Sequence, residues 1–382
     1  MNVPFLDLSQ QYESISAALD DAVAAVVRSQ RFILGEPVER FETSLAKFLG
    51  VEYAVGCASG TDALLLPLRA FWSQSGDEVV IPSFTFFATA GAVWNAGFRP
   101  AFCDVDPVTF NVTAETVEAA WTERTRGVVP VHLYGQMAPM ADLGAVAGDR
   151  GGFVIEDAAQ AIGASQCEAS EGSTLAGRAA AEAVMAGATG DAGAFSFFPT
   201  KNLGGFGDGG LISTNDSALA EKLKKLRVHG GLKMYHHEMV GTNSRLDALQ
   251  AAVLSAKLPH LESWAEARRA NAALYDEMLA DVAEVITPAT APGNVHVYHQ
   301  YTIRVRRRDE LRAHLTALGI GNALYYPVPL HLQACFEELG YREGDLPVSE
   351  KLCEEVVSLP IFPELGVERV EAVAKAVRGF YR

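Results

Sequence analysis

Short apolar segments alternate with longer amphipathic ones along the first 260 residues of the chain. Residues 13–29 carry apolar side chains at helical spacing and predict an opening helix. Seven later runs predict strands, at residues 51–57, 78–82, 100–105, 126–132, 153–156, 192–197 and 210–214. Because these runs resemble strands buried on both faces, we expect an α/β fold with one seven-stranded, mostly parallel sheet between helices.

The pattern changes in the last third of the chain. Two long segments, residues 244–257 and 259–279, predict helices and lead into a region of different character. There, residues 298–305 predict a strand, whereas residues 309–318 and 367–377 predict helices. We therefore expect two domains, a large one at residues 1–280 that includes the opening helix and a smaller α+β domain at residues 281–382.

Residues 167–190 interrupt the alternation of strands and helices. They are rich in Ala, Gly, Ser and Glu and contain few large apolar side chains. We expect a surface excursion with a short helix around residues 178–185.

Composition narrows the class of protein. The chain has 382 residues and a formal net charge of −16, which repels phosphate backbones, and it has no long Lys/Arg run, so we expect no nucleic-acid partner. It has no uncharged apolar run of about 18 residues, so we expect no membrane span. Its five cysteines are scattered without Cys-x-x-Cys spacing, and its first residues do not resemble a secretion signal. These features predict a cytoplasmic protein with reduced thiols.

The segment SFFPTKNLGG at residues 196–205 places one lysine between an apolar strand and two glycines. Burial at such a place would lower the pKa of Lys201 and free its amine to form a Schiff base. Taken alone, the segment fits a lysine that caps a strand end equally well.

A second apolar strand ends in acid, in the segment VIEDAAQ at residues 154–160. A carboxylate delivered to a strand's carboxyl end could bind metal, act as an acid or base, or pair with a protonated ring nitrogen. Pyridoxal phosphate requires the last of these roles, because protonation lets its ring accept electrons. The alternative is that Asp157 caps the next helix.

A third segment, GCASGTD at residues 56–62, joins a strand to a helix that we expect to start near Ala63. The unpaired amides at a helix start bind anions, and small residues let a phosphate approach the backbone. Ser196 could add its hydroxyl. Ordinary helix capping explains the same residues.

Two other chemistries receive little support. Residues 205–210 read G-x-G-x-x-G, as in nicotinamide dehydrogenases, but the motif runs into a predicted strand instead of leaving a strand and opening a helix. The only close histidine pairs, 236/237 and 296/299, sit in no recognisable ligand set, so we expect no metal.

Five ordered motifs resemble those of the sugar aminotransferase family often called the DegT type. They are GTDAL at 60–64, PSFTF at 82–86, EDAAQ at 156–160, SFFPTKNLG at 196–204 and NSRLD at 243–247. The likeness runs from residue 5 to residue 360. Members are homodimeric fold-type I enzymes of the aspartate aminotransferase superfamily, which use pyridoxal phosphate and act in deoxyaminosugar and polysaccharide biosynthesis. They move an amino group, usually from glutamate, to a keto sugar on a nucleotide.

The resemblance implies a role for each motif residue. Lys201 would carry the cofactor and shuttle a proton, with pyridoxamine phosphate as the aminated form, and Asp157 would pair with the pyridinium. Phe86 would stack on the ring, and Gln160 would hydrogen-bond the ring hydroxyl.

The resemblance also implies a phosphate site and a sugar site. The phosphate would be held by Gly60, Thr61, Asp62 and Ser196, and by Asn243 of the neighbouring subunit. In relatives, the sugar site is bordered by stretches that contain Arg245, Tyr326 and His331.

Substrate choice is less defined. Residues 298–303 and 325–331 look most like relatives that act at C3 of a nucleotide-linked 3-keto sugar, with a C4 acceptor as the alternative. One rival is a sugar dehydratase, in which histidine replaces the lysine, and the presence of Lys201 disfavours it. The other is a non-catalytic regulator, which the intact lysine, acid and phosphate set disfavours. The interval from Gln160 to Lys201 is longer than in typical relatives, and we expect the extra residues to decorate the surface or the rim of the site.

Overall fold

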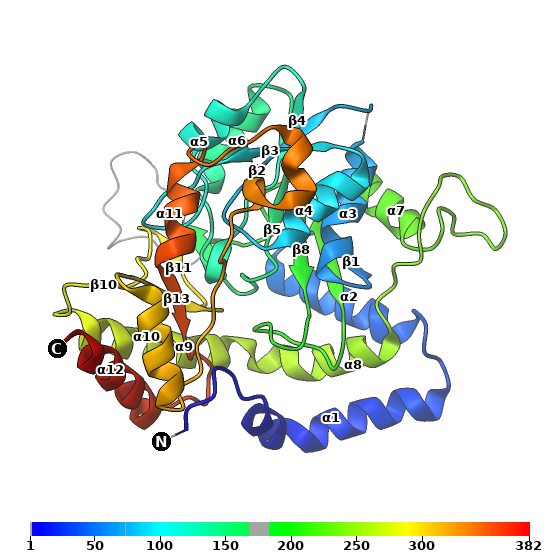
Figure 1. The fold of residues 1–382 in the computed structure, drawn as a ribbon. Coiled ribbons are helices and arrows are strands. Elements are labelled where there is room, and N and C mark those ends of the chain that lie inside the picture. The colour runs from blue at the N-terminus through cyan, green and yellow to red at the C-terminus, as the bar shows by residue number, and fades with distance from the viewer. Residues whose placement is uncertain (1, 73, 168–182) are drawn as a thin grey trace.

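A seven-stranded sheet forms the centre of the computed structural model, which describes residues 2–72, 74–167 and 183–382 (Figure 1). Its spatial order is β1-β9-β8-β5-β4-β2-β3. The strands are β1 (Tyr53–Cys57), β2 (Glu78–Pro82), β3 (Arg99–Cys103), β4 (Thr125–Val128), β5 (Phe153–Asp157), β8 (Ala192–Ser196) and β9 (Gly210–Thr214). Neighbours from β8 to β3 run parallel, whereas β9 is antiparallel to both β1 and β8. The expected mostly parallel α/β sheet is therefore confirmed.

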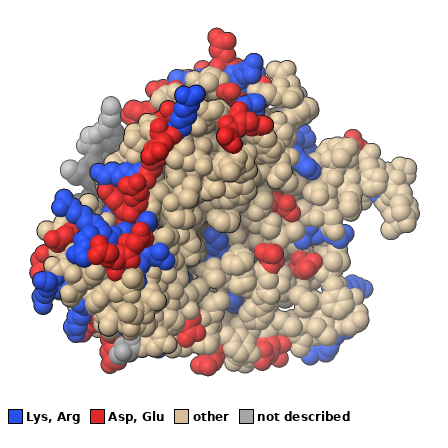
Figure 2. Space-filling view, viewed as in Figure 1, with Lys and Arg blue, Asp and Glu red and all other residues tan. Residues whose placement is uncertain are grey.

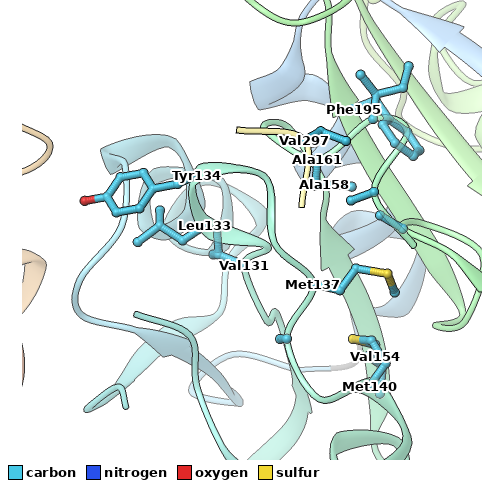
Figure 3. Packing of buried hydrophobic residues seen from close by; sticks show 14 of the residues in the cluster. Val131, Leu133, Tyr134, Met137, Met140, Val154, Ala158, Ala161, Phe195 and Val297 are labelled. Atoms are coloured by element: carbon cyan, nitrogen blue, oxygen red, sulfur yellow. The ribbon is translucent and has the colours of Figure 1, made fainter. Parts of the chain in front are cut away.

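Helices cover both faces of this sheet. Successive side chains of a strand point to opposite faces, so Val79 and Ile81 of β2 join one core and Val80 joins the other. The first core includes α3 (Gly60–Phe71), α4 (Phe87–Ala96) and α7 (Ser217–Leu226). The second includes α2 (Glu36–Leu49), α5 (Ala114–Ala120), α6 (Met140–Gly148) and α8 (Ala248–Lys257). Figure 3 shows part of the second core, with Val131, Leu133 and Tyr134 on the segment that follows β4.

Two further helices connect this body to the rest of the chain. The opening helix α1 (Ser9–Ser29) packs on α8, where Val26 contacts a small cluster with Ala248 and Ala252. After α8, a short 3₁₀ turn leads into α9 (Leu261–Leu279). The helices predicted at residues 13–29, 244–257 and 259–279 thus all form and end where predicted, but they start at Ser9, Ala248 and Leu261.

The C-terminal region has its own antiparallel sheet and core. The sheet contains β10 (Val285–Ile286), β12 (Tyr301–Val305) and β13 (Val356–Leu359). The helices there are α10 (Arg308–Ala317), α11 (Pro347–Glu355) and α12 (Val367–Tyr381). Its core also takes Val3 and, from α9, Ala272 and Tyr275. The strand begins at Tyr301 and not at residue 298, because Tyr298 has a φ of 42°, which breaks the extended backbone.

The expected helix around residues 178–185 is wrong where the structure describes it. Residues 183–185 form β7 (Ala183–Met185), which pairs with β6 (Ser165–Cys167), and β6 pairs with β11 (Asn294–Val295). Residues 178–182 lie outside the described residues. Pairing with segments distant in sequence, which periodicity cannot reveal, makes this a strand.

Charge is distributed without a large basic area on the face in Figure 2, where acidic and basic side chains lie beside one another. Within residues 2–72, 74–167 and 183–382, no helix is long and apolar enough to cross a membrane.

Candidate active site

A cavity of about 590 Å³ opens at the carboxyl ends of β5 and β8, where ligand sites of such sheets gather. Eight residues identified from the sequence line it: Gly60, Thr61, Phe86, Asp157, Gln160, Ser196, Lys201 and Tyr326. They come from five separate stretches of the chain, and the fold brings them together.

Lys201 lies on the loop that leaves β8. Its backbone N–H donates to the carbonyl of Phe198 at 2.9 Å, and Gly204 approaches Pro199 so closely that a Cβ there would clash with the backbone. Burial lowers the pKa of the Lys201 amine to about 8, although the charge of Asp157 opposes that change. No described residue hydrogen-bonds the amine, so it is available to react.

Asp157 ends β5 and faces the same cavity. Its Oδ2 accepts a hydrogen bond from the Thr89 hydroxyl at 2.8 Å, and its Oδ1 accepts one from the N–H of Ala159 at 3.2 Å. Burial raises the pKa of this carboxyl, while Thr89, Ala159 and the Lys201 charge oppose the rise. The carboxyl is therefore rigidly held, and a cationic partner in the cavity would favour its ionised form.

The side chain of the neighbouring acid, Glu156, points to the opposite face of the sheet. Its carboxylate is fully buried and lies 2.7 Å from Nε2 of His132. It also accepts hydrogen bonds from the backbone of Gly187, Thr189 and Gly190 at 2.7–2.8 Å. These contacts lower its pKa despite burial. Of the two adjacent acids, only Asp157 lines the cavity.

The start of α3 forms another wall of the cavity. The helix begins at Gly60, three residues before the expected start, because the Ser59 hydroxyl caps it by accepting from the N–H of Asp62 at 3.2 Å. No described group accepts from the backbone N–H of Gly60 or Thr61. A Cβ on Gly60 would lie 2.5 Å from Cβ of Ser196, so only glycine allows this close approach.

Phe86, Gln160 and Tyr326 form a connected group on the cavity wall. The Gln160 side chain accepts from the N–H of Tyr134 at 2.6 Å and donates to the Tyr326 hydroxyl at 3.1 Å. The rings of Phe86 and Tyr326 lie 6.2 Å apart. Phe86 is 57% exposed, so its ring can contact a bound molecule.

Four residues identified from the sequence do not line the cavity of their own chain: Asp62, Asn243, Arg245 and His331. Asp62 accepts from the Ser244 hydroxyl at 2.7 Å. His331 is buried between the Ser83 hydroxyl, 2.6 Å from Nδ1, and Glu350, 3.1 Å from Nε2. Asn243 is exposed.

Sequence reasoning missed two residues of the site. Thr89 holds Asp157, but 68 positions separate the two, and no local pattern links them. His299 lines the cavity, and its Nδ1 lies 3.1 Å from Oδ1 of Asn202. The sequence analysis included His299 in a close histidine pair and in the stretch at residues 298–303, but gave its side chain no role.

The structure also tests the G-x-G-x-x-G motif. Gly210 begins β9, so the motif enters a strand and opens no helix, unlike a dinucleotide fingerprint. Among the described residues, no group of three His, Cys, Asp or Glu side chains could hold a metal ion.

Known proteins are similar to this chain over nearly its whole length. The model of the DegT/DnrJ/EryC1/StrS aminotransferase family matches residues 13–378. A pleiotropic regulatory protein of Geobacillus stearothermophilus is 49% identical, with 100% of this chain and 99% of that protein covered. The UDP-N-acetyl-3-dehydro-alpha-D-glucosamine 3-aminotransferase of Acidithiobacillus ferrooxidans is 42% identical, with 98% and 97% covered. The crystal structure of S. venezuelae DesV in complex with a ketimine intermediate has a TM-score of 0.93 at 42% identity, with 100% and 99% covered.

Proposed function

The chain belongs to the DegT/DnrJ/EryC1/StrS aminotransferase family, and from that premise we propose that it transfers an amino group from glutamate to C3 of a 3-keto sugar carried on a nucleotide. One observation carries the chemistry: a buried lysine amine, to which no described residue hydrogen-bonds, lies in the same cavity as a buried carboxyl. The A. ferrooxidans relative, named for a 3-dehydro sugar, supports C3.

Pyridoxal phosphate is the cofactor, with pyridoxamine phosphate as its aminated form, and the cavity fits it. The close contact of Gly60 with Ser196 and the unpaired amides of Gly60 and Thr61 make a cradle for a phosphate. Lys201 would hold the cofactor covalently, and Asp157 would face its ring nitrogen. When bound, the cofactor supplies the electron sink that stabilises a carbanion.

The chain's own residues then have distinct tasks. Nζ of Lys201 takes the proton from the α-carbon of the amino donor and later returns a proton to the sugar carbon, since a pKa near 8 suits both transfers at neutral pH. Among the described residues that line the cavity, Lys201 is the only amine. Thr89 keeps Asp157 in place, and Phe86 and Gln160 orient the ring.

We assign the remaining residues to the edges of the site. Asn243 reaches the phosphate of the partner subunit in a homodimer with shared active sites. Tyr326 borders the sugar. Arg245 and His331 belong to the sugar site only through the family resemblance, and His331 acts there indirectly, because its ring is buried against Ser83 and Glu350.

The test is product analysis. The protein is incubated with glutamate and a panel of 3-keto and 4-keto nucleotide sugars, and mass spectrometry and NMR identify the aminated carbon. We expect amination of 3-keto sugars with formation of 2-oxoglutarate. Amination of 4-keto sugars alone would overturn the C3 assignment.

The name of the G. stearothermophilus relative favours a second candidate, a regulatory role without catalysis. A protein that binds the cofactor but gives no product with any sugar, and whose visible absorption does not change with glutamate, would support that role.

A further inference from the structure

The ring of His299 is held in one orientation by Asn202. The Asn202 side chain donates from Nδ2 to the carbonyl of Val297 at 3.1 Å, which leaves its Oδ1 to accept. Nδ1 of His299 lies 3.1 Å from that oxygen. The proton of a neutral ring must therefore be on Nδ1, and Nε2 carries a lone pair.

The other nitrogen opens into the cavity. No described residue donates to Nε2, yet Nε2 is not among the fully enclosed polar atoms that lack a partner. Because His299 lines the cavity, its accessible nitrogen faces that space. The backbone is fixed as well, since the N–H of His299 donates to the Tyr134 carbonyl at 2.8 Å.

The surroundings of His299 define what Nε2 can do. Burial and the charges of Lys201 and Arg268 keep the pKa of the imidazole well below its usual value of 6.5. Such a ring is neutral at physiological pH and is a weak base, whereas the Lys201 amine has a pKa of about 8. His299 is thus suited to accept a hydrogen bond and poorly suited to carry a proton.

His299 and Lys201 line the same cavity, and the charge of Lys201 helps to lower the pKa of the His299 ring, so the two side chains lie near one another. We propose that Nε2 of His299 accepts a hydrogen bond from a hydroxyl or amide N–H on the sugar carbon next to the one that is aminated. His299 then selects sugars that carry such a donor, with Asn202 as the residue that positions it. This inference rests on the proposed function.

Two amide substitutions test the two ring nitrogens of His299 separately. In His299→Gln, the longer amide can place an acceptor where Nε2 lies, whereas in His299→Asn, the shorter amide can keep the contact with Asn202 but does not reach the cavity. We expect kcat/KM for the sugar to fall about tenfold in His299→Asn, the worth of one hydrogen bond, and to return to within about twofold of wild type in His299→Gln. The thermal denaturation of each variant and the absorption spectrum of its cofactor-loaded form control for folding and cofactor binding.

A substrate analogue without that neighbouring hydroxyl or amide completes the test. The kcat/KM of wild type should be about tenfold lower for the analogue than for the sugar. The kcat/KM of His299→Asn should be the same for both, because the substitution and the analogue remove the same contact. If wild type aminates the sugar and His299→Asn matches it, the inference is overturned while the proposed function stands. If wild type aminates no nucleotide sugar, both are overturned.

A measurement without catalysis tests the ring itself. Imidazole ¹⁵N NMR of cofactor-free protein should find His299 with a proton on Nδ1 and none on Nε2 at neutral pH. In Asn202→Leu, the preference for Nδ1 should weaken. A proton on Nε2, or an imidazolium at neutral pH, would contradict the proposal.

Discussion

Two regions differ in how far their side chains have partners within one chain. They are the cavity around Lys201 and the arm, which we define as residues 229–241 between α7 and α8. In the cavity, Asp157 and Gln160 have partners within the chain. The arm projects from the body (Figure 1), and its hydrogen bonds are mainly within itself or to its base; the backbone N–H of Glu238, for example, donates to the carbonyl of Gly230 at 2.8 Å. Most of its apolar side chains are exposed, among them Tyr235 at 88% and Val240 at 91%.

This difference indicates that the cavity serves the reaction and that the arm serves association between chains. One chain supplies the Lys201 amine, the Asp157 carboxyl and the helix start at Gly60 to the same cavity. The same chain leaves exposed apolar groups on the arm, and such groups in soluble proteins often mark interaction sites. We therefore expect single substitutions in the cavity to remove chemistry from a folded protein, and substitutions in the arm to act through association.

The largest effect should come from Lys201→Ala. Loss of the amine removes both covalent attachment and proton transfer, so transamination should be undetectable while the protein remains folded. Borohydride reduction of cofactor-loaded wild type, followed by peptide mapping, should place the adduct on Lys201.

Lys257 is the matched control for that assignment. Burial lowers its pKa to about 8 as well, but its amine donates to the Gly204 carbonyl at 2.7 Å and does not line the cavity. Lys257→Met should keep the adduct on Lys201. An adduct on Lys257, or on Lys47 or Lys233, would contradict the assignment.

Asp157→Asn should have the next largest effect. The neutral amide fills the same space but cannot hold the ring nitrogen protonated, so both half-reactions should slow by about three orders of magnitude or more with cofactor still bound. Single-turnover absorbance measurements with glutamate test this. Near-normal rates would mean that Asp157 is structural.

Mixing variants tests whether Asn243 acts across a dimer. Its neighbour Ser244 contacts the loop before α3 of its own chain, so an action within one chain is a real alternative. If Asn243 serves the partner, equal amounts of Lys201→Ala and Asn243→Ala should exchange subunits and recover up to about a quarter of wild-type activity, because half the dimers carry one intact site of two. No recovery after proven exchange would assign Asn243 to its own chain.

The arm should control association. Met234 is 78% exposed in one chain, so Met234→Ser with Tyr235→Ser should not destabilise a monomer. If a second copy buries these side chains, the dimer dissociation constant should rise about 100-fold or more. Sedimentation velocity measures it, with Val108→Ser, at a residue 54% exposed elsewhere, as the control. Equal constants for both variants would exclude the arm from the interface.

The smallest effect concerns stability and pH. The folded-state pKa of Lys201 is about 8, below its usual 10.5, so between these values the unfolded chain binds more protons and the free energy of unfolding of wild type rises with pH. Below pH 8, cofactor-free Lys201→Met should be more stable by up to about 3 kcal/mol, and the difference should shrink as pH rises from 8 to 10.5. Denaturant titrations test this, with Lys47→Met, at an exposed residue, as the control; a pH-independent difference would contradict the lowered pKa.

The sequence alone determined the sheet and the main candidates of the site. Its strands have apolar runs long enough to be recognised locally, and Lys201, Asp157 and Gly60 stand at junctions between an apolar strand and polar or small residues. Each signal is contained within about ten residues, so it survives without knowledge of the fold.

The tertiary structure alone decided which polar groups meet. It paired Thr89 with Asp157 and His299 with Asn202, turned Glu156 away from the cavity, and buried His331. It also made residues 183–185 a strand through pairing with β6. These contacts join residues far apart in the chain, and a hydrogen bond depends on distance and direction in space, which periodicity and composition do not encode.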